Sequence, residues 1–366
     1  KIFGMYFVKN YLEKLERKRA YSDRLYKKNY LLLDRNEKFI PLDQKLKKKL
    51  IKRLSKINPG LYPNISSFYK KLSKWIGLPR ENIFLTEGVS GAIKNIIECY
   101  TLPGKNNIVF PYPTFAMYSV YCDMFNIQGR KIGYTKNYEL NFKLLLKSIN
   151  KKTAIVFLPN PNIPIEGILN KKKILKLIDK CKKLKVILAI DEVYYPFSNY
   201  SSLGLINKYK NLLIMRSFSK AFGLAGIRLG YILGNKKNIN YVSKTRTAYE
   251  SNSFSMEIAS FFMEHKREAF KYIKEVKRGF RYFKKRLNKY GIHHNGGNHS
   301  CFIYVNLNSK KFANNVVDKL ITKNIFVRGK WPKPYDKGIL ISGTTFKNFK
   351  KFSNEFFKIY NFYKKK

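Results

Sequence analysis

Five short apolar segments alternate with helical stretches between about residue 85 and residue 235. Each segment is continuously apolar, which is typical of strands buried on both faces of a sheet. Between two of them, apolar residues recur at helical spacing. This alternation predicts an α/β fold with a mostly parallel central sheet. The predicted strands are Ile108–Phe110, Ala154–Leu158, Val186–Ile190, Leu212–Met215 and Tyr231–Leu233.

The pattern changes after about residue 245 and predicts a smaller α+β domain. The N-terminal segment around Leu31–Phe39 is expected to join it. We therefore predict that residues 1–55 form a segment joining the small domain, 56–245 the large domain and 246–366 the small C-terminal domain. The expected elements are a helix over Met256–Leu287, strands Phe302–Val305, Ile325–Val327 and Ile339–Ile341, and helices near 312–323 and 347–360.

Length and composition predict a globular protein with a substantial core, since 45% of the 366 residues are hydrophobic. No apolar run approaches the roughly 18 residues needed to span a bilayer, so we expect no membrane partner. The four cysteines are far apart and suggest neither a disulfide framework nor a metal knuckle. We expect a cytoplasmic, reducing environment.

The net charge of +51 allows two interpretations. One is a non-enzymatic nucleic-acid-binding protein, which would bind DNA or RNA with a steep salt dependence. The other is biased composition, because the lysines are spread over every segment together with many Ile, Asn, Tyr and Phe residues. No Arg-rich arm, zinc finger or RNA-binding aromatic motif accompanies the charge, so we expect no specific nucleic-acid partner. The charge could still attract anionic substrates.

Polar and glycine-containing loops follow the predicted strands, where ligands bind in open α/β sheets. The first is Thr86–Ile93, a glycine-containing turn leading into a helix, whose free N–H groups could bind phosphate. The second is Pro111–Phe115, where the aromatic ring of Phe115 could stack on a flat ligand or simply belong to the core.

The most informative loop contains Lys220, which follows an apolar strand and lies among small and hydroxyl residues. A lysine in that setting is poorly explained as surface charge. It fits an amine held in a pocket to form a Schiff base with pyridoxal phosphate. Ser217, Ser219 and Arg228 would then hold the phosphate.

A second strand ends in Asp191, with Tyr194 three residues later. Asp191 would pair with the protonated pyridine nitrogen, and Tyr194 would hydrogen-bond the ring hydroxyl oxygen. The alternative is an ordinary aspartate that caps the next segment. Because parallel strands end at one edge of a sheet, Asp191 and Lys220 should stand over the same edge.

At these residues the chain resembles a known family. The run Ser217–Tyr231 is similar to the lysine signature of the class I/II aminotransferases, which are fold type I enzymes dependent on pyridoxal 5'-phosphate (PLP). Asp191–Tyr194 resembles the family's Asp-Glu-Ala-Tyr, and Tyr112–Phe115 resembles its Pro-Thr-Tyr segment, with Phe115 at the stacking position. The resemblance covers about residues 30–360 and is strongest to the histidinol-phosphate aminotransferases.

The resemblance implies a PLP-dependent aminotransferase that moves an amino group between an amino acid and a small oxo substrate, anionic or phosphorylated. It implies catalytic roles for Lys220, Asp191 and Tyr194, and substrate contacts for Asn36 and Arg328. The implied cofactor contacts are Gly88, Val89, Ser90, Phe115, Asn162, Asp191, Tyr194, Ser217, Ser219, Lys220 and Arg228.

The resemblance also implies a homodimer with shared active sites. Leu61-Tyr62-Pro63 is similar to the family's Arg-Tyr-Pro segment, in which the tyrosine reaches the phosphate of the neighbouring subunit's cofactor. On this basis Tyr62 is expected to complete the cofactor site of the partner.

The sequence departs from the family in the loop Asn160–Gly167. Ile163 replaces the asparagine that precedes the second proline, and one residue is inserted before the glycine. We expect Asn162 to contact the ring hydroxyl oxygen, with Asn160 as the alternative.

A second departure lies in Gly338–Gly343, where the family has Leu-Arg-Ile-Ser-x-Gly and this chain has no arginine. The loss of a buried arginine–carboxylate pair should cost several kcal/mol of substrate affinity unless another cation replaces it. Several basic side chains could replace it, and the sequence does not rank them. The change also permits an alternative reaction, PLP-dependent decarboxylation of a phosphorylated amino acid. The candidate cations are Arg35, Lys330, Lys333 and Lys337.

His293, His294, His299 and Cys301 lie within one short stretch. Histidine and cysteine are common zinc ligands, so one interpretation is a metal site. The other is a polar loop before the strand Phe302–Val305, similar to a family turn that holds no metal. We expect no metal here.

Overall fold

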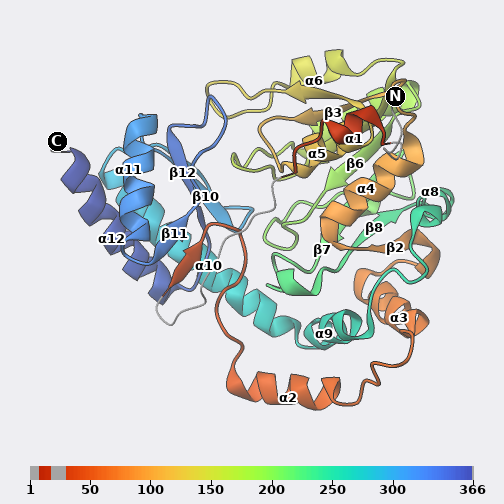
Figure 1. Cartoon of the computed structure of the whole chain (residues 1–366), viewed down its shortest axis with the longest axis horizontal. Helices are drawn as coiled ribbons and strands as arrows, with labels where there is room; N and C mark the ends of the chain where they lie inside the picture. The colour runs from red at the N-terminus through yellow and green to blue at the C-terminus, as the bar shows by residue number, and fades with distance from the viewer. Residues whose placement is uncertain (1–7, 18–29, 365–366) are drawn as a thin grey trace, which may run out of the picture.

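The computed structural model describes residues 8–17 and 30–364. Seven strands form its central sheet: β2 (Ile83–Thr86), β3 (Asn107–Pro111), β4 (Gln128–Ile132), β5 (Thr153–Pro159), β6 (Ile187–Asp191), β7 (Leu212–Ser217) and β8 (Gly230–Gly234). Their order is β2-β8-β7-β6-β5-β3-β4 (Figure 1). All neighbours from β7 to β4 are parallel, whereas β8 is antiparallel to both β7 and β2. The predicted α/β fold with a mostly parallel central sheet is confirmed.

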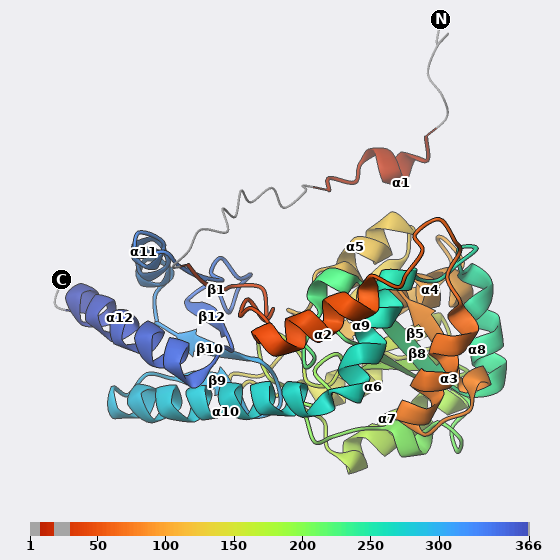
Figure 2. The same ribbon diagram turned by 90° about the horizontal axis from the view of Figure 1, so that it is seen from below.

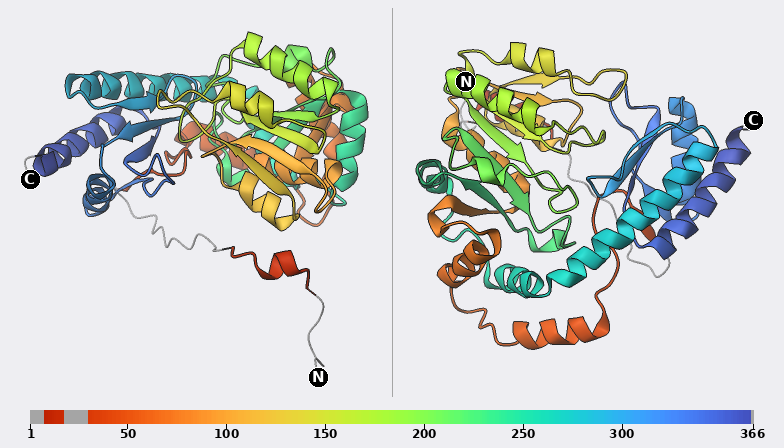
Figure 3. Two further views of the ribbon diagram at one scale, coloured as in Figure 1. Left: turned by 90° about the horizontal axis from the view of Figure 1, so that it is seen from above. Right: turned by 180° about the vertical axis from the view of Figure 1, so that it is seen from behind.

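Helices cover both faces of this sheet, which explains why its strands are continuously apolar. Consecutive residues of β5 show the effect: Ile155 packs in one buried cluster and Val156 in another. One cluster includes residues of α4 (Gly88–Tyr100), α5 (Met117–Met124) and α8 (Lys236–Val242). The other includes residues of α3 (Ile65–Ile76), α6 (Phe142–Ser148), α7 (Lys171–Lys183) and α9 (Ser253–Glu264). Figure 3 shows the sheet between these helices from two further sides.

A second lobe contains a three-stranded antiparallel sheet of order β12-β10-β9, built from β9 (His294–Gly296), β10 (Phe302–Asn306) and β12 (Gly338–Ser342). Beside it, β1 (Leu31–Leu33) pairs in parallel with β11 (Ile325–Val327). The helices of this lobe are α10 (Lys266–Lys289), α11 (Lys310–Ile321) and α12 (Phe346–Lys364). The N-terminal strand β1 and the C-terminal elements therefore share one lobe (Figure 2).

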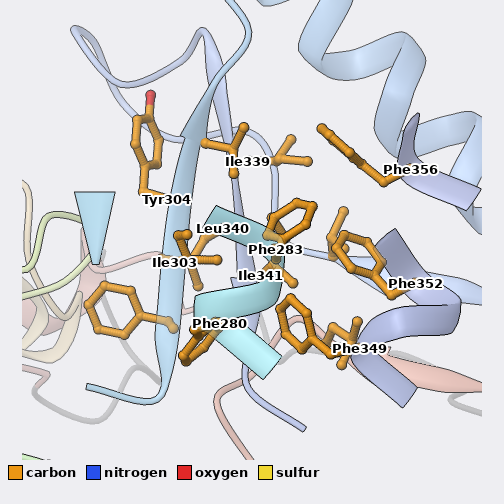
Figure 4. Close-up of a cluster of buried hydrophobic side chains, with 14 of the residues drawn as sticks. Phe280, Phe283, Ile303, Tyr304, Ile339, Leu340, Ile341, Phe349, Phe352 and Phe356 are labelled. Carbon is orange, nitrogen blue, oxygen red and sulfur yellow. The ribbon is translucent and has the colours of Figure 1, made fainter. Parts of the chain in front are cut away.

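Aromatic side chains make the core of the second lobe. Rings from α10 and α12 gather beside the apolar residues of β10 and β12 (Figure 4). Pairs such as Phe283 with Phe349 meet edge to face at 5.5 Å between ring centroids, a favourable geometry for aromatic rings. This core, separate from the clusters on the large sheet, fixes β12 at the boundary between the lobes. The labelled rings of α10 and α12 are Phe280, Phe283, Phe349, Phe352 and Phe356.

Several predicted boundaries differ from the observed ones. The single helix expected over Met256–Leu287 is two helices, α9 and α10, because His265 leaves the helical conformation and its Nδ1 lies 2.8 Å from the Phe261 carbonyl oxygen. β2, β4 and β9 were not predicted, and β4 is an edge strand with mostly polar, partly exposed residues. α2 (Gln44–Leu54) and the short α1 (Asn10–Glu13) precede the sheet.

The domain limits 1–55, 56–245 and 246–366 stay a prediction, and residues 1–7 and 18–29 of the first range lie outside the described residues. Within the described parts of the chain, no helix combines the length and apolarity that crossing a membrane requires.

Glu166 connects the loop Asn160–Gly167, which is one residue longer than in the resembled family, to the turn between β9 and β10. Its carboxylate accepts hydrogen bonds from the backbone N–H of His299 (2.8 Å) and from the Ser300 hydroxyl (2.6 Å). Its own N–H donates to Asn295 Oδ1 (2.7 Å). Hydrogen bonds to a charged acceptor are stronger than neutral ones, so this contact should hold the two lobes together.

Glu166→Ala is expected to lower the free energy of unfolding by about 2 kcal/mol, because several donors of one turn would lose a charged acceptor. Chemical denaturation monitored by circular dichroism measures the change. The exposed Glu139→Ala is the control and should change stability by under about 0.5 kcal/mol. Equal effects of the two substitutions would show that the contact between the lobes does not contribute to the free energy of unfolding.

Candidate active site

The central cavity lies at the carboxyl ends of β5, β6 and β7 and at the start of α4, where an α/β sheet is expected to bind its ligand. It brings together most of the side chains predicted from the sequence. Three of the predicted residues, Gly88, Asn162 and Tyr62, do not line it. Those that do are Asn36, Val89, Ser90, Phe115, Asp191, Tyr194, Ser217, Ser219, Lys220, Arg228 and Arg328.

Lys220 lies just beyond the end of β7, and its Nζ donates a hydrogen bond to the Arg35 carbonyl oxygen (3.2 Å). Loss of hydration in the cavity lowers the pKa of its amine, while Cys301 and Glu37 oppose that shift. A lower pKa leaves more of the amine neutral at a given pH. Because only the neutral amine attacks a carbonyl carbon, the site favours Lys220 as a nucleophile.

Asp191 ends β6 and is buried with both carboxylate oxygens hydrogen-bonded. Tyr118 donates to Oδ2 (2.7 Å), and the N–H of Val193 donates to Oδ1 (2.9 Å). Burial raises the pKa of Asp191 to about 6, while these two hydrogen bonds act in the opposite direction. Tyr118 was not predicted, since one tyrosine among 27 carries no signal of its own.

Glu192, the residue after Asp191, forms a buried ion pair with Arg216. Arg216 Nη2 lies 2.8 Å from Glu192 Oε2, and the N–H of Ser202 donates to Glu192 Oε1 (2.6 Å). The guanidinium also lies 3.7 Å from the ring centroid of Tyr195. This pair joins the ends of β6 and β7 and so fixes the positions of Asp191 and of the Lys220 loop relative to each other.

Hydroxyl groups, an arginine and a helix N-terminus meet at one end of the cavity. Ser217 Oγ and Ser219 Oγ are 2.9 Å apart, and Arg228 Nη2 donates to Ser90 Oγ (3.1 Å) at the first turn of α4. Gly88 has φ of 65°, and a Cβ atom there would lie 3.0 Å from Arg228 Nη2. These groups can donate many hydrogen bonds to a phosphate.

Asn36 links the two lobes above the cavity. Its Nδ2 donates to the Tyr194 hydroxyl (3.3 Å), and its Oδ1 accepts from Ser342 Oγ (2.8 Å). Its backbone N–H donates to the same Ser342 oxygen (2.7 Å). The site therefore needs the N-terminal segment, the central sheet and β12 together.

The two asparagines predicted as alternatives for contacting the ring hydroxyl oxygen both form hydrogen bonds with other groups of the protein. Asn162 is fully buried, accepts a hydrogen bond from Thr114 Oγ1 and donates to the Pro113 carbonyl oxygen (2.8 Å). Asn160 Oδ1 accepts from the N–H of Leu169 (2.8 Å). Neither lines the cavity, so a contact of either with a cofactor stays a prediction.

Tyr62 lies outside the cavity and is 81% exposed. Its ring stacks on that of Tyr249, with 4.5 Å between centroids and 10° between planes. Nothing in a single chain brings Tyr62 to the cofactor site, and its predicted role in a neighbouring subunit stays a prediction. In the histidine-rich stretch, as elsewhere in residues 8–17 and 30–364, no group of three or more His, Cys, Asp or Glu side chains could hold a metal ion.

The donor set fits PLP. The phosphate end offers hydroxyls, an arginine and a helix N-terminus, and the same cavity offers a buried carboxylate for a protonated ring nitrogen. Lys220 and the half-exposed Phe115 line this cavity too.

The comparisons with known proteins show the family to which the chain belongs. The family Aminotransferase class I and II matches residues 28–333, and the chain belongs to it. Aminotransferases of this family use PLP as their cofactor. The chain is 32% identical to a histidinol-phosphate aminotransferase of Pyrococcus furiosus over 65% of this chain and 69% of that protein. It is 30% identical to the Ruminiclostridium cellulolyticum histidinol-phosphate aminotransferase over 81% and 83% of the two chains.

The fold also matches solved structures. The histidinol-phosphate aminotransferase of Sinorhizobium meliloti in complex with pyridoxal-5'-phosphate superimposes with a TM-score of 0.85 over 99% of each chain. At 16% sequence identity, this likeness supports the fold alone. Together, the comparisons confirm the predicted class I/II aminotransferase and the predicted cofactor, PLP.

Tyr118→Phe is expected to raise the pKa of Asp191, because the hydroxyl stabilises the ionised carboxylate. The acidic limit of cofactor binding should then move to higher pH by about one unit. Titrations of PLP binding by visible absorption across pH values measure this limit. Tyr121→Phe, on the same helix, is the control and should leave it unchanged. An unshifted limit in Tyr118→Phe would show that the hydrogen bond does not tune Asp191.

Proposed function

We propose that this aminotransferase transfers an amino group between an amino acid and a small oxo substrate that is anionic or phosphorylated, as in the histidinol-phosphate aminotransferases it resembles. The observation that carries the proposal is one cavity that holds Lys220, Asp191 and three arginines, Arg35, Arg228 and Arg328. Arg228 belongs to the phosphate end, which leaves Arg35 and Arg328 for an anionic group of the substrate.

Bound PLP supplies an electrophilic carbon and a ring that accepts electrons. Asp191 would hold a proton on the ring nitrogen, since its carboxylate is already oriented by Tyr118 and Val193. Tyr194 would donate to the ring hydroxyl oxygen, while Ser217, Ser219 and Arg228 would bind the phosphate. The Lys220 amine, with its pKa lowered by burial, would move the proton between the substrate carbon and the electrophilic carbon of the cofactor.

We further propose a homodimer with shared active sites. The exposed Tyr62–Tyr249 stack is an aromatic surface of the kind that protein interfaces bury. In this arrangement Tyr62 would contact the phosphate of the partner's cofactor. A cytoplasmic location is also proposed, because the four cysteines are free and two thiols are buried in the sheet lobe without a disulfide.

The alternative reaction is decarboxylation of a phosphorylated amino acid. Leu340 permits it, since it stands where the resembled family has the arginine that binds a carboxylate or phosphate. A neighbour of the fold is an L-threonine-O-3-phosphate decarboxylase of Porphyromonas gingivalis, at 20% identity and a TM-score of 0.73. Product analysis separates the two reactions, since transamination forms an oxo product and decarboxylation releases carbon dioxide.

Lys220→Ala is expected to abolish turnover and the visible absorption band that PLP acquires on binding to the lysine. Spectra of wild type and variant with added PLP measure the band, and mixing with histidinol phosphate and 2-oxoglutarate measures turnover. Lys285→Ala, on α10, is the control and should retain both. A folded wild type without a Lys220-dependent band would contradict the enzymatic function. A band without formation of an oxo product from any phosphorylated or anionic amine would contradict the substrate class.

A further inference from the structure

A second hollow lies beside the cofactor cavity, between α3, α9, the start of α10, the loop after β6 and the end of β7. Figure 1 shows α3 and α9 next to each other, with α10 leading from α9 toward the second lobe. Neighbouring residues of the chain separate the two spaces: Tyr194 and Ser217 line the cofactor cavity, whereas Tyr195 and Arg216 line the second hollow. Among the described residues, none lines both spaces, so a ligand in the second hollow would not take the place of PLP.

The walls of the second hollow are largely aromatic. Trp75 of α3, Tyr195 and Phe270 of α10 line it, and Phe270 is 49% exposed. The Arg216 guanidinium lies over the Tyr195 ring, and its charge is matched by Glu192. The volume of the hollow is about 650 Å³, which is typical of sites for small molecules. Walls of this kind favour a ligand with an aromatic ring, because rings stack or meet edge to face.

The carboxylate that lines the second hollow is already paired. Glu264 forms an ion pair with Arg53, which also pairs with Glu257. Lys71 Nζ, in the same hollow, lies 3.7 Å from Glu264 as well. A cationic group of a ligand would therefore compete with cations of the protein, so the hollow does not favour a positively charged ligand.

Two lysines of the second hollow have no such partner. Lys74 of α3 and Lys266 of α10 line it, and no carboxylate of a described residue lies within ion-pair distance of either. Lys266 Nζ lies 5.6 Å from the ring centroid of Trp75. Glu268, in the same turn of α10, does not line the hollow and interacts with Lys38 instead. An anionic group of a ligand can therefore reach these lysines while its ring lies against Trp75.

The second hollow also contains a buried hydroxyl group without a hydrogen-bond partner. Ser260 of α9 lines the hollow and is only 3% exposed. Its hydroxyl makes no hydrogen bond to any other described residue. Because buried polar groups in folded proteins are nearly always hydrogen-bonded, a ligand oxygen that accepts from this hydroxyl would be stabilised.

We propose that the second hollow is a binding site for a small aromatic acid in its anionic form. The ring would lie against Trp75 and Phe270, and the carboxylate would lie near Lys74 and Lys266, within reach of the Ser260 hydroxyl. The aromatic walls supply most of the contact area, whereas the lysines select for a negative charge. Such a ligand binds the PLP-loaded enzyme without displacing the cofactor.

Titration calorimetry of the PLP-loaded enzyme with phenylacetate tests the proposal. Wild type is expected to bind phenylacetate more tightly than acetate, which lacks the ring, and than benzyl alcohol, which lacks the charge. The double variant Lys74→Ala/Lys266→Ala should weaken phenylacetate binding at least about fivefold, because both unpaired cations are removed. Lys70→Ala/Lys271→Ala removes two exposed lysines of the same helices outside the hollow, and should bind as wild type does.

Fluorescence gives the location of the ligand, since Trp75 is one of two tryptophans in the chain. Phenylacetate should change the emission of wild type, and Trp75→Phe should remove this change while calorimetry still detects binding to the retained aromatic wall. Equal affinities for the three ligands, or an undiminished affinity in Lys74→Ala/Lys266→Ala, would overturn the proposal. An equal loss in Lys70→Ala/Lys271→Ala, a fluorescence change that persists in Trp75→Phe, or loss of the PLP absorption band on adding phenylacetate would do the same.

Discussion

The site depends on the desolvation of one amine. Lys220 can act as a nucleophile near neutral pH only where water is excluded and its pKa falls. The carboxyl end of a buried strand covers the amine on one side, but an open sheet edge alone would leave the amine in contact with water. Arg35 and Asn36 cover it from the second lobe, and Asn36 is hydrogen-bonded to Ser342 of β12. The second lobe is therefore part of the chemistry, because its contacts add to the burial that lowers the pKa of Lys220.

This requirement explains the chain topology. Asn36 can cover Lys220 only because β1 pairs with β11, far along the chain, and thereby enters the second lobe. β12 is fixed in turn by the aromatic core that α10 and α12 build behind it. Glu166 adds a direct contact between the lobes at the turn before β10. Positioning of one lysine thus draws on contacts spread over most of the described sequence.

Much of the fold and site could be predicted from the sequence, and the exceptions have physical causes. Strands buried on both faces, such as β5 and β6, leave a continuous apolar run that is easily detected. The edge strand β4 lacks that pattern because one of its sides is exposed. Loop residues with distinctive chemistry, such as Lys220 and Asp191, were found, whereas Tyr118 was missed. Its importance comes only from the hydrogen bond to Asp191, which the fold creates.

The distribution of acidic residues bears on the large positive charge. Only 23 acidic residues balance 74 basic ones, yet several of them occupy positions where a carboxylate is structurally required. Glu192 pairs with the buried Arg216, and Glu166 binds the turn between the lobes. Exposed lysines, in contrast, stay hydrated whether or not they have partners, and isolated surface pairs contribute little to stability. A strongly basic composition is therefore compatible with this fold, provided that carboxylates remain at the few buried positions that need them.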